Sequence, residues 1–185
     1  RVDSLAVAVA TEAFDEIRSR RTWRGDTRFV PACIMFVTYA SAGSSVPATP
    51  DGRLSGAPVA DSIGPMQGRD TNGPTAMLQS VAKLPLHDAI GTPIVNIRFS
   101  KDLFHTGQGR EKLKSLIRAY FAMGGMQLQI SVIDQDAIRD AILHPDRHAD
   151  LIVRIGGYSE YFNNLSPELK QSVLERTEHL FSSTV

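Results

Sequence analysis

An apolar segment runs directly into paired glycines near the end of the 185-residue chain: Leu151-Ile152-Val153-Arg154-Ile155-Gly156-Gly157-Tyr158. The apolar run predicts a strand over 151–155. Gly156-Gly157 breaks this strand, because glycine is the usual residue where a chain turns tightly. Ser166-Pro167-Glu168 then predicts a helix start, with serine as N-cap and proline in the first turn, and we expect the helix to run to about Phe181. A plain glycine turn between strand and helix remains the alternative.

Upstream, helical and extended patterns alternate, which indicates an α/β architecture. Helical periodicity and capping residues predict helices over 3–20, 110–122 and 134–143. Apolar runs predict strands over 28–40, 92–99 and 126–133. Alternation along the last of these strands places Met126, Leu128, Ile130 and Val132 on one face, and Gln127, Gln129 and Ser131 on the other. Residues 41–75 are rich in glycine and proline and are expected to form a long structured loop.

The composition excludes several classes of function. Lys plus Arg and Asp plus Glu both number 20, so no charge excess points to nucleic acid or to an anionic membrane. No apolar run approaches the roughly 18 residues of a membrane span, and we expect a cytoplasmic protein. Cys33 is the single cysteine and reads as a small buried residue on a strand. Pro145 separates His144 from His148, so no metal site is expected.

Arg154-Ile155-Gly156-Gly157-Tyr158 resembles the Arg-Val-x-Gly-Tyr signature of glycyl radical enzymes, with isoleucine in place of valine at position 155. Further segments resemble the same family in the same order: Ala48-Thr49-Pro50-Asp51-Gly52-Arg53, Gly56-Ala57-Pro58-Val59-Ala60-Asp61, Gly68-Arg69-Asp70-Thr71-Asn72-Gly73-Pro74-Thr75-Ala76 and Ser80-Val81-Ala82-Lys83. The chain is identified by these motifs as a member of the family, similar to pyruvate formate-lyase and to glycyl radical dehydratases.

The resemblance implies that Gly157 stores an unpaired electron, with Arg154, Ile155, Gly156 and Tyr158 as its neighbours in the radical loop. Loss of an α-hydrogen leaves a radical that the adjacent amide nitrogen donates into and the adjacent carbonyl withdraws from. The centre must become planar, which a side chain would hinder. Because the site must exclude water and oxygen, we expect a buried loop tip.

The resemblance also implies the fold: the C-terminal part of a ten-stranded α/β barrel, carrying a glycyl radical finger loop. We expect residues 1–140 to belong to the barrel and residues 141–185 to form the glycyl radical domain. No cofactor or metal is expected to be bound, because a radical S-adenosylmethionine (radical SAM) activating enzyme installs the radical on the protein. The family's catalytic cysteine lies in a separate loop, and Cys33 matches no such loop pattern. The chain therefore resembles the small subunit of a split enzyme, or a fragment, whose large partner carries that cysteine.

The resemblance implies an anaerobic lyase acting on a small molecule, with dehydratase-type elimination as the first hypothesis. An arylacetate decarboxylase and a fumarate-adding synthase are alternatives within the family. A spare-part protein that rescues a damaged glycyl radical enzyme is the alternative from another class. In the family, a strand preceding the Pro-Asp-Gly-Arg segment lines the substrate pocket. The candidates at that place are Met35, Phe36, Val37 and Thr38.

Overall fold

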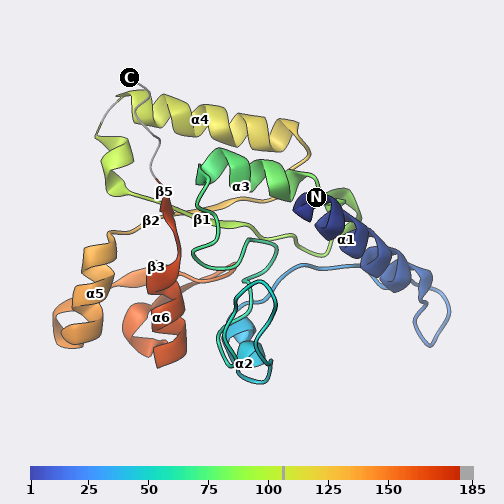
Figure 1. The fold of residues 1–185 in the computed structure, drawn as a ribbon, viewed down its shortest axis with the longest axis horizontal. Coiled ribbons are helices and arrows are strands. Elements are labelled where there is room, and N and C mark those ends of the chain that lie inside the picture. The colour runs from blue at the N-terminus through green and yellow to red at the C-terminus, as the bar shows by residue number, and fades with distance from the viewer. Residues whose placement is uncertain (106, 180–185) are drawn as a thin grey trace.

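The computed structural model describes residues 1–105 and 107–179 and confirms the α/β class (Figure 1). Its helices are α1 (Val2–Ser19), α2 (Thr38–Ser44), α3 (Gly73–Ala82), α4 (Gly107–Ala122), α5 (Gln135–Leu143) and α6 (Pro167–Glu175). Its strands are β1 (Asn96–Phe99), β2 (Gln129–Val132), β3 (Ile152–Arg154), β4 (Ser159–Tyr161) and β5 (Glu178–His179). Short 3₁₀ turns lie at Leu86–Asp88, Lys101–Phe104, Pro145–His148 and Phe162–Asn164.

The central feature is a parallel sheet in the order β2-β1-β5, with β1 between its two partners. Parallel sheets are normally covered on both faces. Here α3 and α4 lie on one side of the strands, and α2, α5 and α6 lie on the other (Figure 1). β3 and β4 form a separate antiparallel hairpin on the second side.

Two hydrophobic clusters hold these layers together. The first joins α3, α4 and β1 through Met77, Leu78, Val81, Val95, Ile97, Phe99, Leu113, Leu116 and Tyr120. The second joins α2, α5, α6 and the hairpin through Tyr39, Ala40, Ile138, Ala141, Val153, Ile155, Phe162, Leu165, Leu169 and Val173. Because the second cluster draws on residues from both sides of position 140, the two expected domains pack together. Their division into 1–140 and 141–185 stays a prediction.

Several local predictions are confirmed by the caps that begin the helices. The Asp134 side chain accepts a hydrogen bond from Asp136 N–H at 3.0 Å and starts α5. The Ser166 hydroxyl accepts from Leu169 N–H at 3.4 Å and starts α6. Both contacts satisfy backbone donors that a helix leaves free in its first turn. The long loop between α2 and α3 is ordered as expected, since the buried Arg53 side chain donates to the carbonyl oxygens of Val46, Pro47 and Ala57.

Two predicted elements are wrong. Residues 28–40 do not form a strand: Cys33 makes an isolated parallel bridge with Pro93, and the chain then enters α2 at Thr38. An apolar run indicates burial but does not by itself distinguish a strand from a short helix. The last helix ends at Glu175, not at about Phe181, because Arg176 has an extended conformation with ψ of 131° and leads into β5. Phe181 lies outside the described residues.

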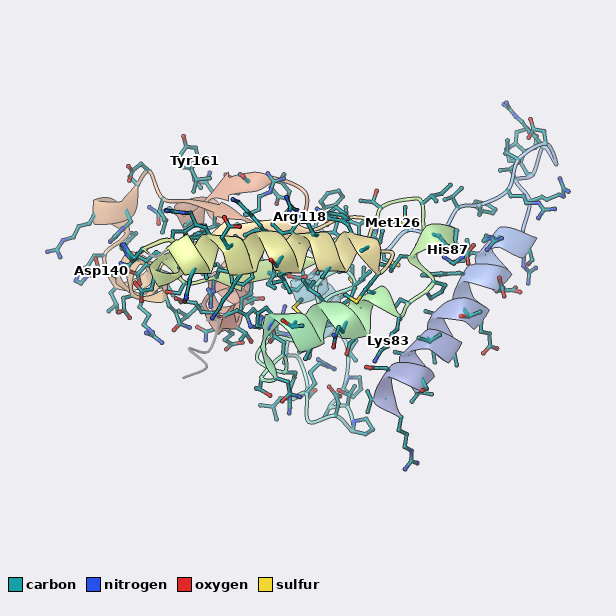
Figure 2. The ribbon with its side chains drawn as sticks, turned by 90° about the horizontal axis from the view of Figure 1, so that it is seen from above. Lys83, His87, Arg118, Met126, Asp140 and Tyr161 are labelled. Carbon is teal, nitrogen blue, oxygen red and sulfur yellow. The ribbon has the colours of Figure 1, made fainter. Side chains whose placement is uncertain are left out.

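α1 lies at one end of the molecule, beside the Lys83 end of α3 (Figure 2). Asp3 in its first turn pairs with Lys83 at the end of α3. Phe14 is its only buried residue within the described chain, and Val2, Leu5 and Val9 are exposed. In the described part of the chain, no helix is both long and apolar enough to cross a bilayer.

Asp70 attaches β5 to the long loop, because its carboxylate accepts hydrogen bonds from Thr177 Oγ1 and from His179 Nε2, the latter at 2.7 Å. Burial raises the pKa of Asp70, but these two hydrogen bonds outweigh it, and the pKa lies below its ordinary value of 3.8. The stabilisation is therefore fully present above pH 3.8 and is lost as the pH falls through the lowered pKa.

The Ser100 amide donates a hydrogen bond to His179 O at 3.2 Å. We predict that this amide loses its protection from hydrogen exchange as the pH falls through the lowered pKa of Asp70. The variant Asp70→Asn should lower this local stability by about 2 kcal/mol at neutral pH and abolish the acid-dependent loss. Hydrogen exchange of the two proteins across pH checks both outcomes. An acid-dependent loss that persists in the variant would assign the effect to another group.

Candidate radical site

The β3–β4 hairpin places Gly157 at its tip. Ile155 N–H donates to Tyr158 O at 3.0 Å, which closes a tight turn around Gly156 and Gly157. Gly157 has a φ of +82°, in the left-handed region that side chains disfavour. The sequence predicts the turn but not β4, whose residues carry little apolar signal.

Gly157 is exposed in this chain, contrary to the expected buried tip. One side of it is nevertheless apolar: a Cβ built on Gly157 would lie 3.4 Å from Ile94 Cδ1 and 3.4 Å from Phe36 Cε1, and 3.9 Å from Ile34 Cδ1. The remaining side is open. The physical reason for the difference is that, among the described residues, the nearest side-chain atoms come from Ile94, Phe36 and Ile34 and leave Gly157 accessible to solvent.

Both peptide groups of Gly157 make hydrogen bonds to side chains. Its N–H donates to Gln129 Oε1 at 3.1 Å. Its carbonyl oxygen accepts from Arg154 Nη2 at 3.2 Å. The turn is thus held by an acceptor from β2 on one side and by a cation from β3 on the other.

Gln129 is placed by strand register. It pairs with Asn96 across β1 and β2, so the two side chains point to the same face of the sheet. Gln129 Nε2 donates to Asn96 Oδ1 and, at 3.5 Å, to Ile155 O. Asn96 Nδ2 donates in turn to Asp61 Oδ1 at 3.1 Å. Gln129 is only 6% exposed, so its amide is held within this network.

Arg176 closes the network from the other end. Its Nη1 donates to Arg154 O at 2.9 Å, and its Nη2 lies 2.9 Å from Asp61 Oδ2 and 3.2 Å from Ile155 O. Arg176 therefore binds the end of β3 to the long loop through an ion pair with Asp61. The adjacent cavity has a volume of about 30 Å³, enough for water but far below the size of a substrate site.

The substrate-lining candidates separate in the structure. Phe36 lies against Gly157, and its ring packs edge-on against Tyr158 with centroids 6.1 Å apart. The backbone oxygen of Met35 lies near Gly156, whereas Val37 caps α2 and Thr38 begins it. Among the four candidates, Phe36 is thus the one whose side chain lies nearest to Gly157 in the described structure. Burial raises the pKa of the Tyr158 hydroxyl.

Two other predictions concern cysteine and metal. Cys33 is half-buried rather than buried, and its burial raises the pKa of the thiol. His144 and His148 both contact Asp140, at 2.9 and 2.7 Å. Across residues 1–105 and 107–179, no group of three or more His, Cys, Asp or Glu residues could hold a metal ion.

Sequence reasoning missed the polar residues around the turn: Asp61, Asn96, Gln129 and Arg176. Asp61 lies within a segment that resembles the family, but the local sequence does not indicate which residue its side chain contacts. The polar face of the strand over 126–133 was a usable signal, since an otherwise buried strand that carries Gln127 and Gln129 must satisfy their amides.

The two glycines of the turn give a matched test of this geometry. Gly157→Ala should destabilise the hairpin by about 1–2 kcal/mol, because alanine pays the left-handed strain that glycine avoids. Gly156→Ala should be tolerated, because its added Cβ would meet its nearest atoms at ordinary contact distances of 3.5 Å or more, without a left-handed φ. Denaturant unfolding of both variants checks this prediction. Equal destabilisation would contradict the assigned turn geometry.

The chain is similar in sequence to a known protein family and to several characterised enzymes. A family model described as "Glycine radical" matches residues 59–163. The trans-4-hydroxy-L-proline dehydratase of Clostridioides difficile is 41% identical over 139 residues, which are 75% of this chain and 18% of the relative. The indoleacetate decarboxylase of Tractidigestivibacter scatoligenes is 32% identical over 179 residues, or 96% of this chain and 20% of the relative.

Solved structures agree with the sequence matches. The glycerol-bound B12-independent glycerol dehydratase from Clostridium butyricum superposes with a TM-score of 0.93 and 37% identity over 97% of this chain, but over only 23% of its own. The chain thus spans about a fifth of the length of the curated relatives it matches. It belongs to the glycyl radical enzyme family and is a C-terminal portion of that family's α/β barrel.

Proposed function

We propose that Gly157 is the radical-bearing residue of an anaerobic glycyl radical lyase. The observation that carries this proposal is the turn itself: a glycine with φ of +82° at an exposed hairpin tip, with both of its peptide groups hydrogen-bonded. Arg154, Ile155, Gly156 and Tyr158 form the loop around it. A plain glycine turn would require neither a buried glutamine nor a cation at these positions.

The chemistry is a hydrogen-atom transfer. A radical SAM activating enzyme removes one α-hydrogen of Gly157, which leaves the unpaired electron on Cα. A cysteine outside these residues then gives its S–H hydrogen to Cα, which restores glycine and leaves a thiyl radical. The thiyl radical starts the reaction by taking hydrogen from a small substrate. The open side of Gly157 is the side from which such a cysteine can approach.

A dehydratase-type elimination on a small hydroxylated substrate is the reaction we favour. It is supported by the relatives named for dehydration, of hydroxyproline in one case and of glycerol in a solved structure. Decarboxylation is a second candidate, because the indoleacetate decarboxylase aligns with 96% of this chain. Phe36 would present an apolar ring beside the radical loop in either case.

The proposal includes a large partner, either a second chain or the rest of a longer one. Two observations support it: the chain spans about a fifth of its relatives, and Gly157 is exposed on one side. A spare-part protein would instead restore activity to a damaged enzyme of the family when mixed with it. Activity with a dedicated partner distinguishes the two.

We predict that the complete enzyme, activated under anaerobic conditions, gives an electron paramagnetic resonance doublet from one α-hydrogen. Gly157→Ala should abolish the doublet, whereas Gly156→Ala should keep it, because only the first variant removes the radical position. Loss of the doublet in both variants would mean that the turn, rather than Gly157, is what the activating enzyme requires. No doublet in the unmodified enzyme, with an activating enzyme proven on a relative, would refute the function.

Exposure of the activated enzyme to air should cut the backbone at Gly157, because oxygen adds to a carbon-centred radical and the resulting peroxyl group leads to chain cleavage there. Mass spectrometry should then find a C-terminal fragment that begins near Gly157. Unactivated enzyme treated in the same way serves as the control and should remain intact. A cut elsewhere would place the radical on another residue.

A further inference from the structure

We propose that Gln129 is a positioning residue that, together with Arg154, polarises the two peptide groups on either side of Gly157 and thereby stabilises a radical on its α-carbon. This inference rests on the proposed function, since it concerns the same site. It assigns a purpose to a buried glutamine from β2, which lies 28 residues before Gly157 in the chain.

The two hydrogen bonds have the polarity that such a radical requires. An acceptor on the Gly157 N–H, here Gln129 Oε1 at 3.1 Å, pushes electron density toward the amide nitrogen and makes it a better donor to the radical. A cationic donor on the Gly157 carbonyl, here Arg154 Nη2 at 3.2 Å, makes that carbonyl a better acceptor. Spin then spreads from the α-carbon in both directions. A cation near the Gly157 N–H or an anion near its carbonyl oxygen would instead hold the spin on the α-carbon.

The orientation of the Gln129 amide follows from the network behind it. Ionised Asp61 can only accept hydrogen bonds, so Asn96 must direct its Nδ2 group toward it. Asn96 therefore presents Oδ1 to Gln129, and Gln129 donates to this oxygen through its Nε2 group. This leaves Gln129 Oε1 for Gly157. The acceptor at the radical position is thus specified by a carboxylate two side chains away.

The network also holds the acceptor in place. Arg176 binds Asp61 and, in addition, the backbone oxygens of Arg154 and Ile155, so the hairpin and the glutamine are tied to the same ion pair. Gln129 Nε2 makes its own contact with Ile155 O. A fixed dipole stabilises a developing electronic state without having to reorient when that state forms. The Gln129 amide meets this condition.

A second glutamine, located just before β2, shows that the arrangement at Gly157 is specific. Gln127 also uses its Oε1 atom to accept from a backbone N–H, that of Val95 at 2.9 Å. It has the same residue type and the same kind of bond as Gln129 and lies two positions before it, but its bond goes to the residue that precedes β1 and not to the hairpin. Gln127 is therefore the natural control.

The test is electron paramagnetic resonance of the complete, anaerobically activated enzyme carrying Gln129→Met, which keeps the length of the side chain and removes the acceptor. We expect a wider α-proton splitting, because more spin stays on the α-carbon. We also expect about fivefold less radical at equilibrium, the factor that one net hydrogen bond corresponds to. A purely structural role would lower the yield without changing the splitting.

Two further variants complete the design. Gln127→Met should leave the splitting and the yield as in the unmodified enzyme. Gln129→Glu should restore the narrower splitting, because its carboxylate accepts from Gly157 N–H once the Asn96 amide turns over to direct Nδ2 toward it, while Arg176 still pairs with Asp61. An unchanged splitting in Gln129→Met, with a normal doublet in the unmodified enzyme, would overturn this inference and leave the proposed function standing. Absence of the doublet from the unmodified enzyme would overturn both.

Discussion

The ion pair between Arg176 and Asp61 is the contact on which the geometry of the site depends. Its two side chains are 12% and 9% exposed, and they lie 115 residues apart in the chain. Removing one partner of such a buried pair typically costs about 3–5 kcal/mol, because the other charge stays buried without compensation. In this chain the same guanidinium also holds two backbone oxygens of the hairpin, so the long loop, the sheet and the radical turn are positioned together.

The pairing of the parallel strands β1 and β2 fixes the position of Gln129 beside Asn96. Side chains in register on neighbouring parallel strands share a face, about 4.8 Å apart, which is why Asn96 and Gln129 can bond directly. The opposite faces of β1 and β2 pack on α3 and α4 as an ordinary apolar core. One sheet therefore serves two purposes, with cohesion on one face and a polar support for Gly157 on the other.

The sequence predicts the parts of this protein that local chemistry decides. The caps at Asp134 and Ser166 and the glycine turn at Gly157 all follow from neighbours in the chain. What sequence reasoning could not find depends on distant partners: β5 is two residues long and forms only because β1 offers an edge. Arg176 ends the last helix for the same kind of reason, since its side chain must reach the hairpin. From the sequence, Gln129 is only a polar residue in a predicted strand. Its pairing with Asn96 becomes known from the register of β1 and β2 in the structure.

The helix α1 has a practical consequence for anyone who handles the protein. Val2, Leu5 and Val9 form an exposed row on one face of the first half of this helix, and Trp23 beyond its other end is 89% exposed. Contiguous apolar surface of this kind promotes self-association in water. The zero formal net charge offers little repulsion to oppose it. Handled by itself, the chain will therefore tend to self-associate, and a low protein concentration is the sound way to keep it in solution.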